Sequence, residues 1–245
     1  MILPLTRLAL PVTLFVSLNA CATTFPPSYI STQLADYRYP DPFSIHSKAD
    51  VAALQSAKWD FSFDLYQDGK KKMTVDNCQA LIAALKKGMK GEDDPSNQHI
   101  FGTDLNCRVN EELLKLGEAQ GSFVRGLPLD ESFARLAPAA LGMQISNEDK
   151  AKAKSAKSWN AFSQIKKVDK INDHEAVFYD GSGGIQHLSV LATGDYNGDG
   201  IEDLVVNLNN SVEGGSFDAS YAFILTRRSK NAPLELLKVF KSRDW

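Results

Sequence analysis

The feature that most constrains the fold is a change of hydrophobic period in the last third of the chain. Six stretches there carry the patterns of β-strands: SWNAFSQIKKV, HEAVFYD, IQHLSVLATGD, DLVVNLNN, ASYAFILTRR and PLELLKVF. The turn-forming sequences DGSGG, DYNGDG and EGGSFD separate several of them. Short turns join strands that run in opposite directions, so this region predicts an antiparallel meander of about five or six strands.

The part of the chain before this sheet contains an early strand pair. Ser47 can cap a short helix over residues 47–57. The stretch WDFSFDLYQ then alternates apolar and polar residues, which is typical of a half-buried strand. Asp68 and Gly69 mark a hairpin turn into the next stretch, KKKMTV. We therefore expect a two-stranded hairpin here.

Helical patterns dominate the middle of the chain. A helix capped by Asp76 is expected, with one stripe formed by Cys78, Leu81, Ile82, Leu85 and Met89. Gly88 and Gly91 end it, and the acidic stretch GEDDPSNQ is expected as a loop. Further helices are expected over VNEELLKLG, DESFARLAPAALG and NEDKAKAKSAK. Helices followed by strands predict a single α+β domain over residues 49–245.

The charge balance argues against a nucleic-acid-binding protein. The 27 basic and 30 acidic residues give a net charge of -3, so the chain as a whole does not attract polyanions. A lysine-rich helix near residues 150–157 could serve as a local basic patch. Lysines at this density on an alanine-rich helix are more often a solvated surface, which is the interpretation we favour.

The N-terminus has the pattern of an export signal. Residues 1–20 contain one cation, Arg7, followed by an apolar stretch that is too short to span a membrane as a mature helix. The sequence Leu18, Asn19, Ala20 and Cys21 resembles the lipobox of bacterial lipoproteins. The resemblance implies acylation of Cys21 and a lipid anchor in the outer membrane of a Gram-negative cell, facing the periplasm.

The residues around Cys21 allow a second interpretation, and a spacer follows them. Ala20 and Ala22 also fit the small-x-small pattern of ordinary signal peptidase, so a secreted and unlipidated protein is the alternative. Residues 21–48 are rich in Pro, Ser, Thr and Tyr, and we expect an extended linker between anchor and domain.

Two cysteines remain after Cys21. Export places Cys78 and Cys107 in an oxidising compartment, and their spacing is not that of a Cys-x-x-Cys motif. We therefore predict a structural disulfide between them. Two buried thiols or a metal pair are the alternatives.

The one motif with specific chemistry is the acidic loop GDYNGDGIEDLVV. Its oxygen-bearing side chains recur at loop positions one, three, five and nine, and residue seven can offer a backbone carbonyl. These predicted calcium ligands are Asp195, Asn197, Asp199, Ile201 through its carbonyl, and Asp203. An EF-hand would need a glutamate at position twelve, where this chain has Val206, and helices on both sides. A metal-free turn of Asx and Gly residues is the alternative.

With β-type sequences on both sides, the loop resembles the FG-GAP, or integrin-type, calcium repeat. The resemblance covers about a dozen residues and implies that the five ligands above hold calcium while Leu204 anchors the following strand. The chain contains no second copy of the motif, so the propeller architecture of that repeat does not carry over. The combination resembles uncharacterised bacterial lipoproteins that carry an FG-GAP motif.

No common catalytic motif is present in the sequence. We therefore expect an outer-membrane-anchored lipoprotein with a structural calcium loop that binds an envelope protein or glycan and does not catalyse a reaction. The alternative is an envelope hydrolase whose carboxylates, for instance Asp60, Asp64, Asp173 and Glu175, converge only in the folded chain.

Overall fold

A computed structural model describes residues 23–34, 38–39, 44–67 and 71–242. The predicted signal segment 1–20 and the predicted lipidation site Cys21 lie outside the described residues. Within the described ranges, no helix is both long and apolar enough to cross a membrane.

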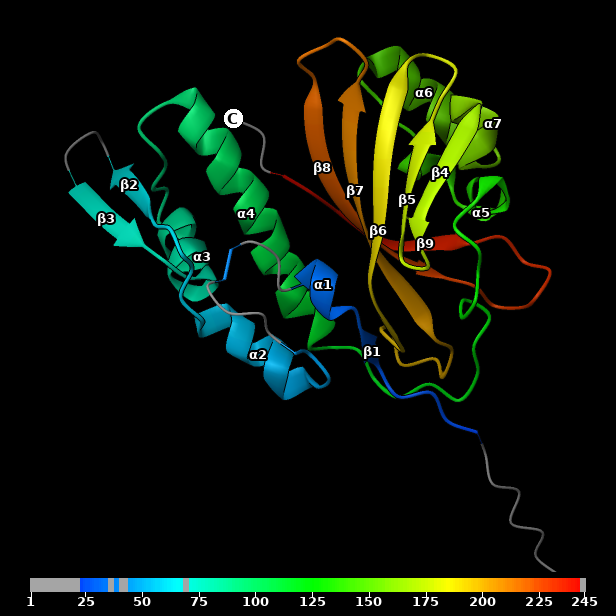
Figure 1. The fold of residues 1–245 in the computed structure, drawn as a ribbon, viewed down its shortest axis with the longest axis horizontal. Coiled ribbons are helices and arrows are strands. Elements are labelled where there is room, and N and C mark those ends of the chain that lie inside the picture. Colours follow the sequence, from blue (N-terminus) through cyan, green and yellow to red (C-terminus); the bar gives the residue numbers. More distant parts are fainter. Residues whose placement is uncertain (1–22, 35–37, 40–43, 68–70, 243–245) are drawn as a thin grey trace, which may run out of the picture.

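The C-terminal third forms an antiparallel sheet, which confirms the predicted meander (Figure 1). Its strands lie in chain order: β4 Lys167–Asn172, β5 Glu175–Tyr179, β6 Gly184–Gly194, β7 Asp203–Val212, β8 Asp218–Thr226 and β9 Glu235–Lys241. A short N-terminal strand, β1 (Ser28–Tyr29), adds to β6 at Thr193 and Ala192. The predicted α+β fold is therefore correct.

The first predicted strand of the meander starts too early. Residues Trp159–Ser163 form a short helix, α7, because the Ser158 hydroxyl accepts a hydrogen bond from the Ala161 N–H (3.2 Å). The chain leaves this helix through Gln164 in a left-handed conformation (φ 52°) and begins β4 only at Lys167. A capping serine thus overrides the strand-like pattern.

The other elements are helices and one hairpin. The hairpin is β2 (Phe63–Gln67) with β3 (Lys71–Val75), as predicted. The remaining helices are α1 Ser31–Leu34, α2 Lys48–Ser56, α3 Cys78–Lys86, α4 Asp94–Leu113, α5 Glu131–Leu136, the 3-10 turn η1 Ala139–Leu141, and α6 Asn147–Ser155. The predicted cap of α2, Ser47, is confirmed, whereas α3 is capped by Asn77 and not by Asp76.

The longest helix begins where the sequence predicted a loop. The Asp93 side chain caps α4 by accepting the Ser96 N–H (2.9 Å), and Pro95 occupies the first turn. Both residues favour a helix start, so most of GEDDPSNQ and all residues up to Leu113 are helical. His99, which follows this stretch, lies on α4.

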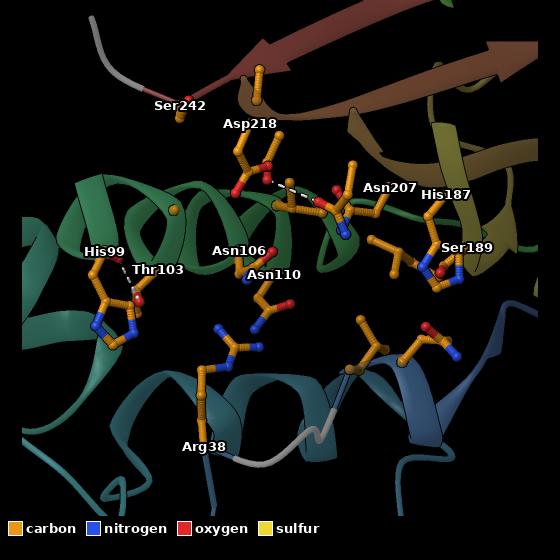
Figure 2. A pocket seen from close by; sticks show the side chains of 18 of the residues that line it. Arg38, His99, Thr103, Asn106, Asn110, His187, Ser189, Asn207, Asp218 and Ser242 are labelled. Carbon is orange, nitrogen blue, oxygen red and sulfur yellow. Dashed lines mark hydrogen bonds between the residues drawn. The ribbon is translucent and has the colours of Figure 1, made fainter. Parts of the chain in front are cut away.

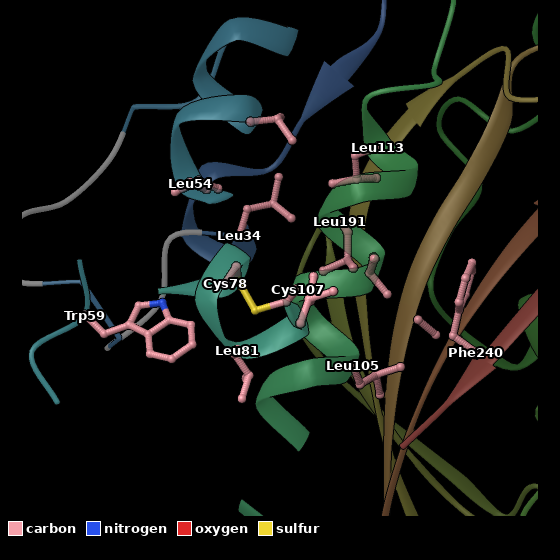
Figure 3. Packing of buried hydrophobic residues seen from close by; sticks show 14 of the residues in the cluster. Leu34, Leu54, Trp59, Cys78, Leu81, Leu105, Cys107, Leu113, Leu191 and Phe240 are labelled. Carbon is pink, nitrogen blue, oxygen red and sulfur yellow. A yellow bond between two sulfur atoms is a disulfide. The ribbon is translucent and has the colours of Figure 1, made fainter. Parts of the chain in front are cut away.

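A disulfide joins α3 to α4, as predicted. Cys78 and Cys107 are bonded, with their Cα atoms 5.3 Å apart, and both are fully buried. The bond lies inside a hydrophobic cluster that also contains residues of α2 and of one sheet face, among them Leu54, Leu191 and Phe240 (Figure 3). Helices α2, α3 and α4 are thereby fixed to each other and to that face.

A second hydrophobic cluster covers the opposite face of the sheet. It joins α5, η1 and α7 to inward-pointing strand residues such as Phe178, Leu188 and Phe223. The sheet is thus a middle layer, with α2–α4 on one side and α5–α7 on the other (Figure 1).

Part of the segment expected to be an extended linker is packed on this body. It contributes the strand β1, and it also buries four side chains in the first hydrophobic cluster: Tyr29, Leu34, Tyr39 and Ile45. The composition is that of a linker, but regularly spaced apolar residues bury enough surface to fold back.

Candidate functional site

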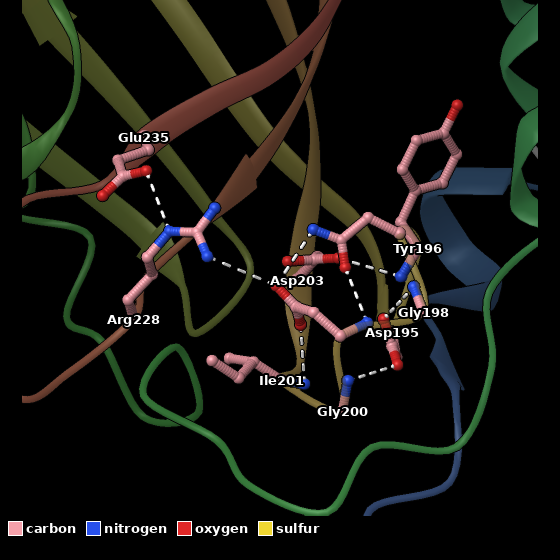
Figure 4. A network of polar contacts seen from close by, with 10 residues as sticks. Asp195, Tyr196, Gly198, Gly200, Ile201, Asp203, Arg228 and Glu235 are labelled. Carbon is pink, nitrogen blue, oxygen red and sulfur yellow. Dashed lines mark hydrogen bonds and ion pairs between the residues drawn. The ribbon is translucent and has the colours of Figure 1, made fainter.

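The acidic loop connects β6 to β7, so strands flank it on both sides, as predicted (Figure 4). Asp195 and Asp203 stand at its two ends and are buried, with 7% and 0% of their surface exposed. Asn197 and Asp199 are exposed at its tip. Gly198 (φ 78°) and Gly200 (φ 80°) adopt left-handed conformations that reverse the chain here.

The loop holds its shape through its own side chains. Asp195 accepts the N–H groups of Gly198 (2.7 Å) and Gly200 (2.8 Å), one on each carboxylate oxygen. The Asn197 side-chain oxygen accepts the Asp199 N–H (3.0 Å), and Asp199 in turn accepts the Ile201 N–H (2.9 Å). Each of these oxygens keeps a second lone pair, so the bonds fix the loop without using up its capacity to bind a cation.

Asp203 has the least satisfied carboxylate of the loop. One oxygen accepts the Tyr196 N–H (2.8 Å), while the other, Oδ1, is buried without a hydrogen-bond partner among the described residues. Burial raises the pKa of this carboxyl above its usual range; the nearby Thr226 side chain and the Tyr196 N–H lower it in part, and the negative charges of Asp199 and Asp195 raise it further. A buried anion of this kind is costly unless a positive charge accompanies it.

The adjacent residue, Glu202, shows the opposite arrangement. Its carboxylate is fully buried, but Arg125 donates to it through two nitrogens at 2.8–3.0 Å, and the Thr193 hydroxyl donates at 2.7 Å. Glu202 is therefore neutralised within the protein, and Asp203 is not. The sequence did not reveal this pair, because 77 residues separate its members and neither belongs to a motif.

Among the described residues, no group of three or more His, Cys, Asp or Glu side chains is arranged so that it could hold a metal ion. The nearest cation is Arg228, whose guanidinium lies 3.7 Å from Asp199 and is held by Glu235 at 3.1 Å. The predicted ligands lie in one loop, and one of their oxygens, Asp203 Oδ1, is buried without a hydrogen-bond partner among the described residues. Calcium binding stays a prediction, and the oxygen chemistry of these residues fits it.

The loop is bonded to the segment that leaves α4. Gly117 and Asp195 exchange both backbone hydrogen bonds (2.6 and 2.9 Å). The Gly200 carbonyl accepts the N–H groups of Gln120 (2.8 Å) and Gly121 (3.1 Å). The loop therefore joins the sheet to the helical layer.

A second connection runs from the loop to α4 itself. The Tyr196 hydroxyl donates to Glu112, which also lies 3.1 Å from the Lys238 ammonium group. Burial opposes the charged form of Glu112, but hydrogen bonds from Lys115, Tyr196 and Lys238 outweigh it and lower the pKa of this carboxyl. Glu112 is a structural contact that the sequence did not indicate.

The carboxylates considered for a hydrolase do not converge. Asp60 is exposed, Asp64 pairs with Lys72 (2.7 Å) on the β2–β3 hairpin, and Asp173 pairs with Lys170 (2.6 Å) at the β4–β5 turn. Glu175 lies 2.7 Å from His187, at ion-pair distance but without a regular hydrogen bond. The described contacts thus pair none of the four with another carboxylate.

Comparison with known proteins adds no relative. No protein-family model, no curated protein and no solved structure matches this chain. The similarity to the FG-GAP repeat therefore rests on the residues of the loop alone, and function has to be inferred from the site.

Proposed function

We propose that this chain is an exported binding protein, without catalytic activity, whose β6–β7 loop holds a structural calcium ion. The observation that carries the proposal is the buried Asp203 carboxylate with its unpartnered Oδ1. Asp195, Asn197, Asp199 and the Ile201 carbonyl would complete the oxygen set with Asp203.

The electrostatics of the loop support a cation. Asp195, Asp199 and Asp203 bring three formal negative charges to a loop of nine residues, and Asp199 and Asp195 already disfavour the charged form of Asp203. Calcium neutralises such a cluster with hard oxygen ligands, whereas Arg228 is within ion-pair distance of only one of the three, the exposed Asp199, among the described residues.

The position of the loop supports a structural role for the ion. The loop is hydrogen-bonded to Gly117 and Gly121 after α4, and Tyr196 reaches Glu112 on α4 itself. A bound ion would therefore stabilise the junction between the helical layer and the sheet. This arrangement suits a binding protein whose two layers must keep a fixed relation.

The cellular location of the protein is the second part of the proposal. The export signal and the lipobox-like Cys21 favour a lipid-anchored protein of the outer membrane, facing the periplasm, with secretion after ordinary cleavage as the alternative. The mature protein would then meet calcium, which the loop requires, and an oxidising environment, which the disulfide requires.

Calcium binding is tested by thermal unfolding of purified Cys21→Ser protein, stripped of ions and then titrated with calcium or magnesium. At about 100 times the dissociation constant, calcium adds about 2.7 kcal/mol, which corresponds to roughly 5–10 °C for a chain of this size. Asp203→Asn and Asp199→Ala should lose the shift, and Asp60→Asn, an exposed aspartate outside the loop, should keep it. An equal shift in all variants, or none in the wild type, contradicts the calcium site.

The anchor is tested separately by the intact mass of the wild-type protein isolated from membranes. Acylation adds mass to a chain that begins at Cys21, and Cys21→Ser abolishes the addition. A mature chain that begins after Ala22 without added mass contradicts the anchor and supports secretion.

A further inference from the structure

A polar cleft of about 740 Å³ lies between helix α4 and the sheet (Figure 2). Its volume falls within the range of small-molecule sites, about 300–1,000 Å³. Part of its lining is apolar: Leu34, Val109 and Leu191, called its floor below, also belong to the first hydrophobic cluster.

Both walls are lined by polar side chains at regular spacing. His99, Thr103, Asn106 and Asn110 form one stripe along α4, at intervals of three or four residues. The facing strands present alternate residues: His187 and Ser189 on β6, Asn207 and Asn209 on β7, and Asp218 and Ser220 on β8. A helix that only packed on a sheet would show apolar residues at these positions.

Three of these side chains carry a buried atom without a hydrogen-bond partner within the described structure; one is His187 Nε2, which lies 2.7 Å from Glu175, and the other two are amide atoms. Asn110 is 2% exposed, and its side-chain Nδ2 donates to no described residue. On the opposite wall, the Asn207 Oδ1 atom is buried and accepts from none. Buried polar groups are normally satisfied, so a donor on one wall and an acceptor on the other point to a ligand that supplies both.

The composition of the lining indicates an uncharged, hydroxyl-rich ligand. Neutral amides and hydroxyls outnumber ionised groups on both walls. The described lining also holds one cation, Arg38, and two carboxylates, Asp218 and Glu175, of which Glu175 lies 2.7 Å from the His187 imidazole. Amides and hydroxyls both donate and accept, as sugar hydroxyls do, whereas a strongly charged ligand would need opposite charges to replace its hydration.

The cleft is continuous with a second groove. Pro95, Gln98, Asp218, Ala219 and Ser242 line both. The second groove adds apolar and aromatic surface from Phe217, Tyr221 and Val239. Such surfaces pack against the apolar faces of sugar rings, so the binding surface extends beyond one sugar.

We propose that this cleft binds a neutral oligosaccharide that carries N-acetylated amino sugars. An acetamido group offers a carbonyl to the Asn110 Nδ2 donor and an N–H to the Asn207 Oδ1 acceptor, and its methyl group suits the floor at Val109 and Leu191. This inference rests on the proposed binding function and specifies its ligand. The cleft and the acidic loop are separate sites.

The test is isothermal titration of the Cys21→Ser protein in excess calcium with a matched pair of sugars. The N-acetylglucosamine trimer is expected to bind at least tenfold more tightly than cellotriose, whose chain has hydroxyls in place of the acetamido groups. Asn110→Leu and Asn207→Leu, one on each wall, should each weaken trimer binding roughly tenfold, the loss of one hydrogen bond. Asn231→Leu, an exposed asparagine in the β8–β9 turn, is the control.

The possible outcomes test the assignment of the ligand separately from the proposed function. Equal binding of both sugars, or no binding, overturns the acetamido assignment, and binding of a neutral tripeptide such as trialanine in place of the trimer replaces it with a peptide site. Unfolding curves of each variant verify that it is folded, and the second wall provides an independent variant. Repeating the titration with Asp203→Asn separates the sites: trimer binding that survives in this variant shows that the cleft does not depend on the calcium loop, while the calcium site itself is judged on the wild type.

Discussion

The two faces of the sheet differ in how fully their buried amide side chains are hydrogen-bonded. On the face covered by α5–α7, the buried amides Gln186 and Asn210 bond to each other (2.9 Å), and Gln186 also accepts from the Trp159 indole N–H (3.0 Å) and donates to the Leu141 carbonyl (2.8 Å). On the face toward α4, Asn110 and Asn207 carry unpartnered buried atoms. One sheet therefore has a face built for packing and a face that is only partly packed.

The partly packed face needs connections that the packed face does not. The disulfide fixes α4 to α3, and the acidic loop with Glu112 fixes α4 to the sheet. Substitutions on the two faces should therefore differ in cost, and removing each connection should show how much it contributes.

The largest effect is expected on the packed face, from Phe178→Ala. This ring is fully buried with its centroid 4.5 Å from that of Trp159, so truncation leaves a cavity and costs about 3–5 kcal/mol. Urea unfolding measures the loss. Val177→Ala, one residue earlier on the other face, should cost clearly less; equal costs would mean that the faces do not differ.

Removal of the disulfide by Cys78→Ala with Cys107→Ala comes next. The bond spans 29 residues and closes a loop in the unfolded chain, so its loss should cost about 2–4 kcal/mol. Denaturant unfolding of the double variant, compared with the oxidised wild type, measures this. If the variant loses less than about 1 kcal/mol, packing alone holds α4 in place.

Asp203→Asn should act in opposite directions with and without calcium. In calcium-free solution it removes an uncompensated buried charge and is expected to raise stability by about 1 kcal/mol. In saturating calcium the wild type gains about 2.7 kcal/mol that the variant does not. Thermal scans in chelator and in calcium would show the reversal, and a variant that is destabilised in both contradicts the assignment of Asp203.

Glu112→Gln should give a smaller and pH-dependent loss. The folded pKa of Glu112 is lowered, so its contribution is complete above the unfolded value near 4.5 and disappears as the pH falls through the lower folded value. The side chain is partly solvated, which limits the expected loss at pH 7 to about 1 kcal/mol. Melting curves of both proteins should converge as the pH falls through the folded pKa of Glu112; a constant difference would indicate a packing effect.

The smallest effect is expected in the cleft. Asn207→Leu removes an unpartnered polar atom and should change the unfolding free energy by less than about 0.5 kcal/mol, or raise it. Urea unfolding without ligand measures this change. A loss of 2 kcal/mol or more would show that Asn207 supports the fold and would weaken its role in binding.

The parts of this protein that the sequence revealed are those whose signals are local. Period-two patterns located the meander, cysteine spacing and an apolar stripe predicted the disulfide, and the Asx and Gly residues located the β6–β7 loop. Asp93 and Pro95 also gave a local helix signal, but their acidic neighbours suggested a loop instead.

The other features depend on contacts between distant segments. Arg125 neutralises Glu202, Tyr196 reaches Glu112 across 84 residues, and the cleft combines one helix with three strands. No pattern within a single segment distinguishes a polar stripe that lines a cleft from one that faces solvent, so His187 and Asn110 could not be assigned before their surroundings were known.

The pairing of Phe25 determines how far the body could lie from a membrane. Phe25 and Ala119 exchange two backbone hydrogen bonds (2.8 and 2.9 Å), and only three residues lie between Cys21 and Phe25, a reach of about 14 Å when fully extended. An acylated Cys21 would thus hold the loop end of the sheet close to the bilayer. The start of β8, at Asp218 beside the cleft, lies at the opposite end of the strands and would face the aqueous space, where a soluble or wall-bound chain could reach it.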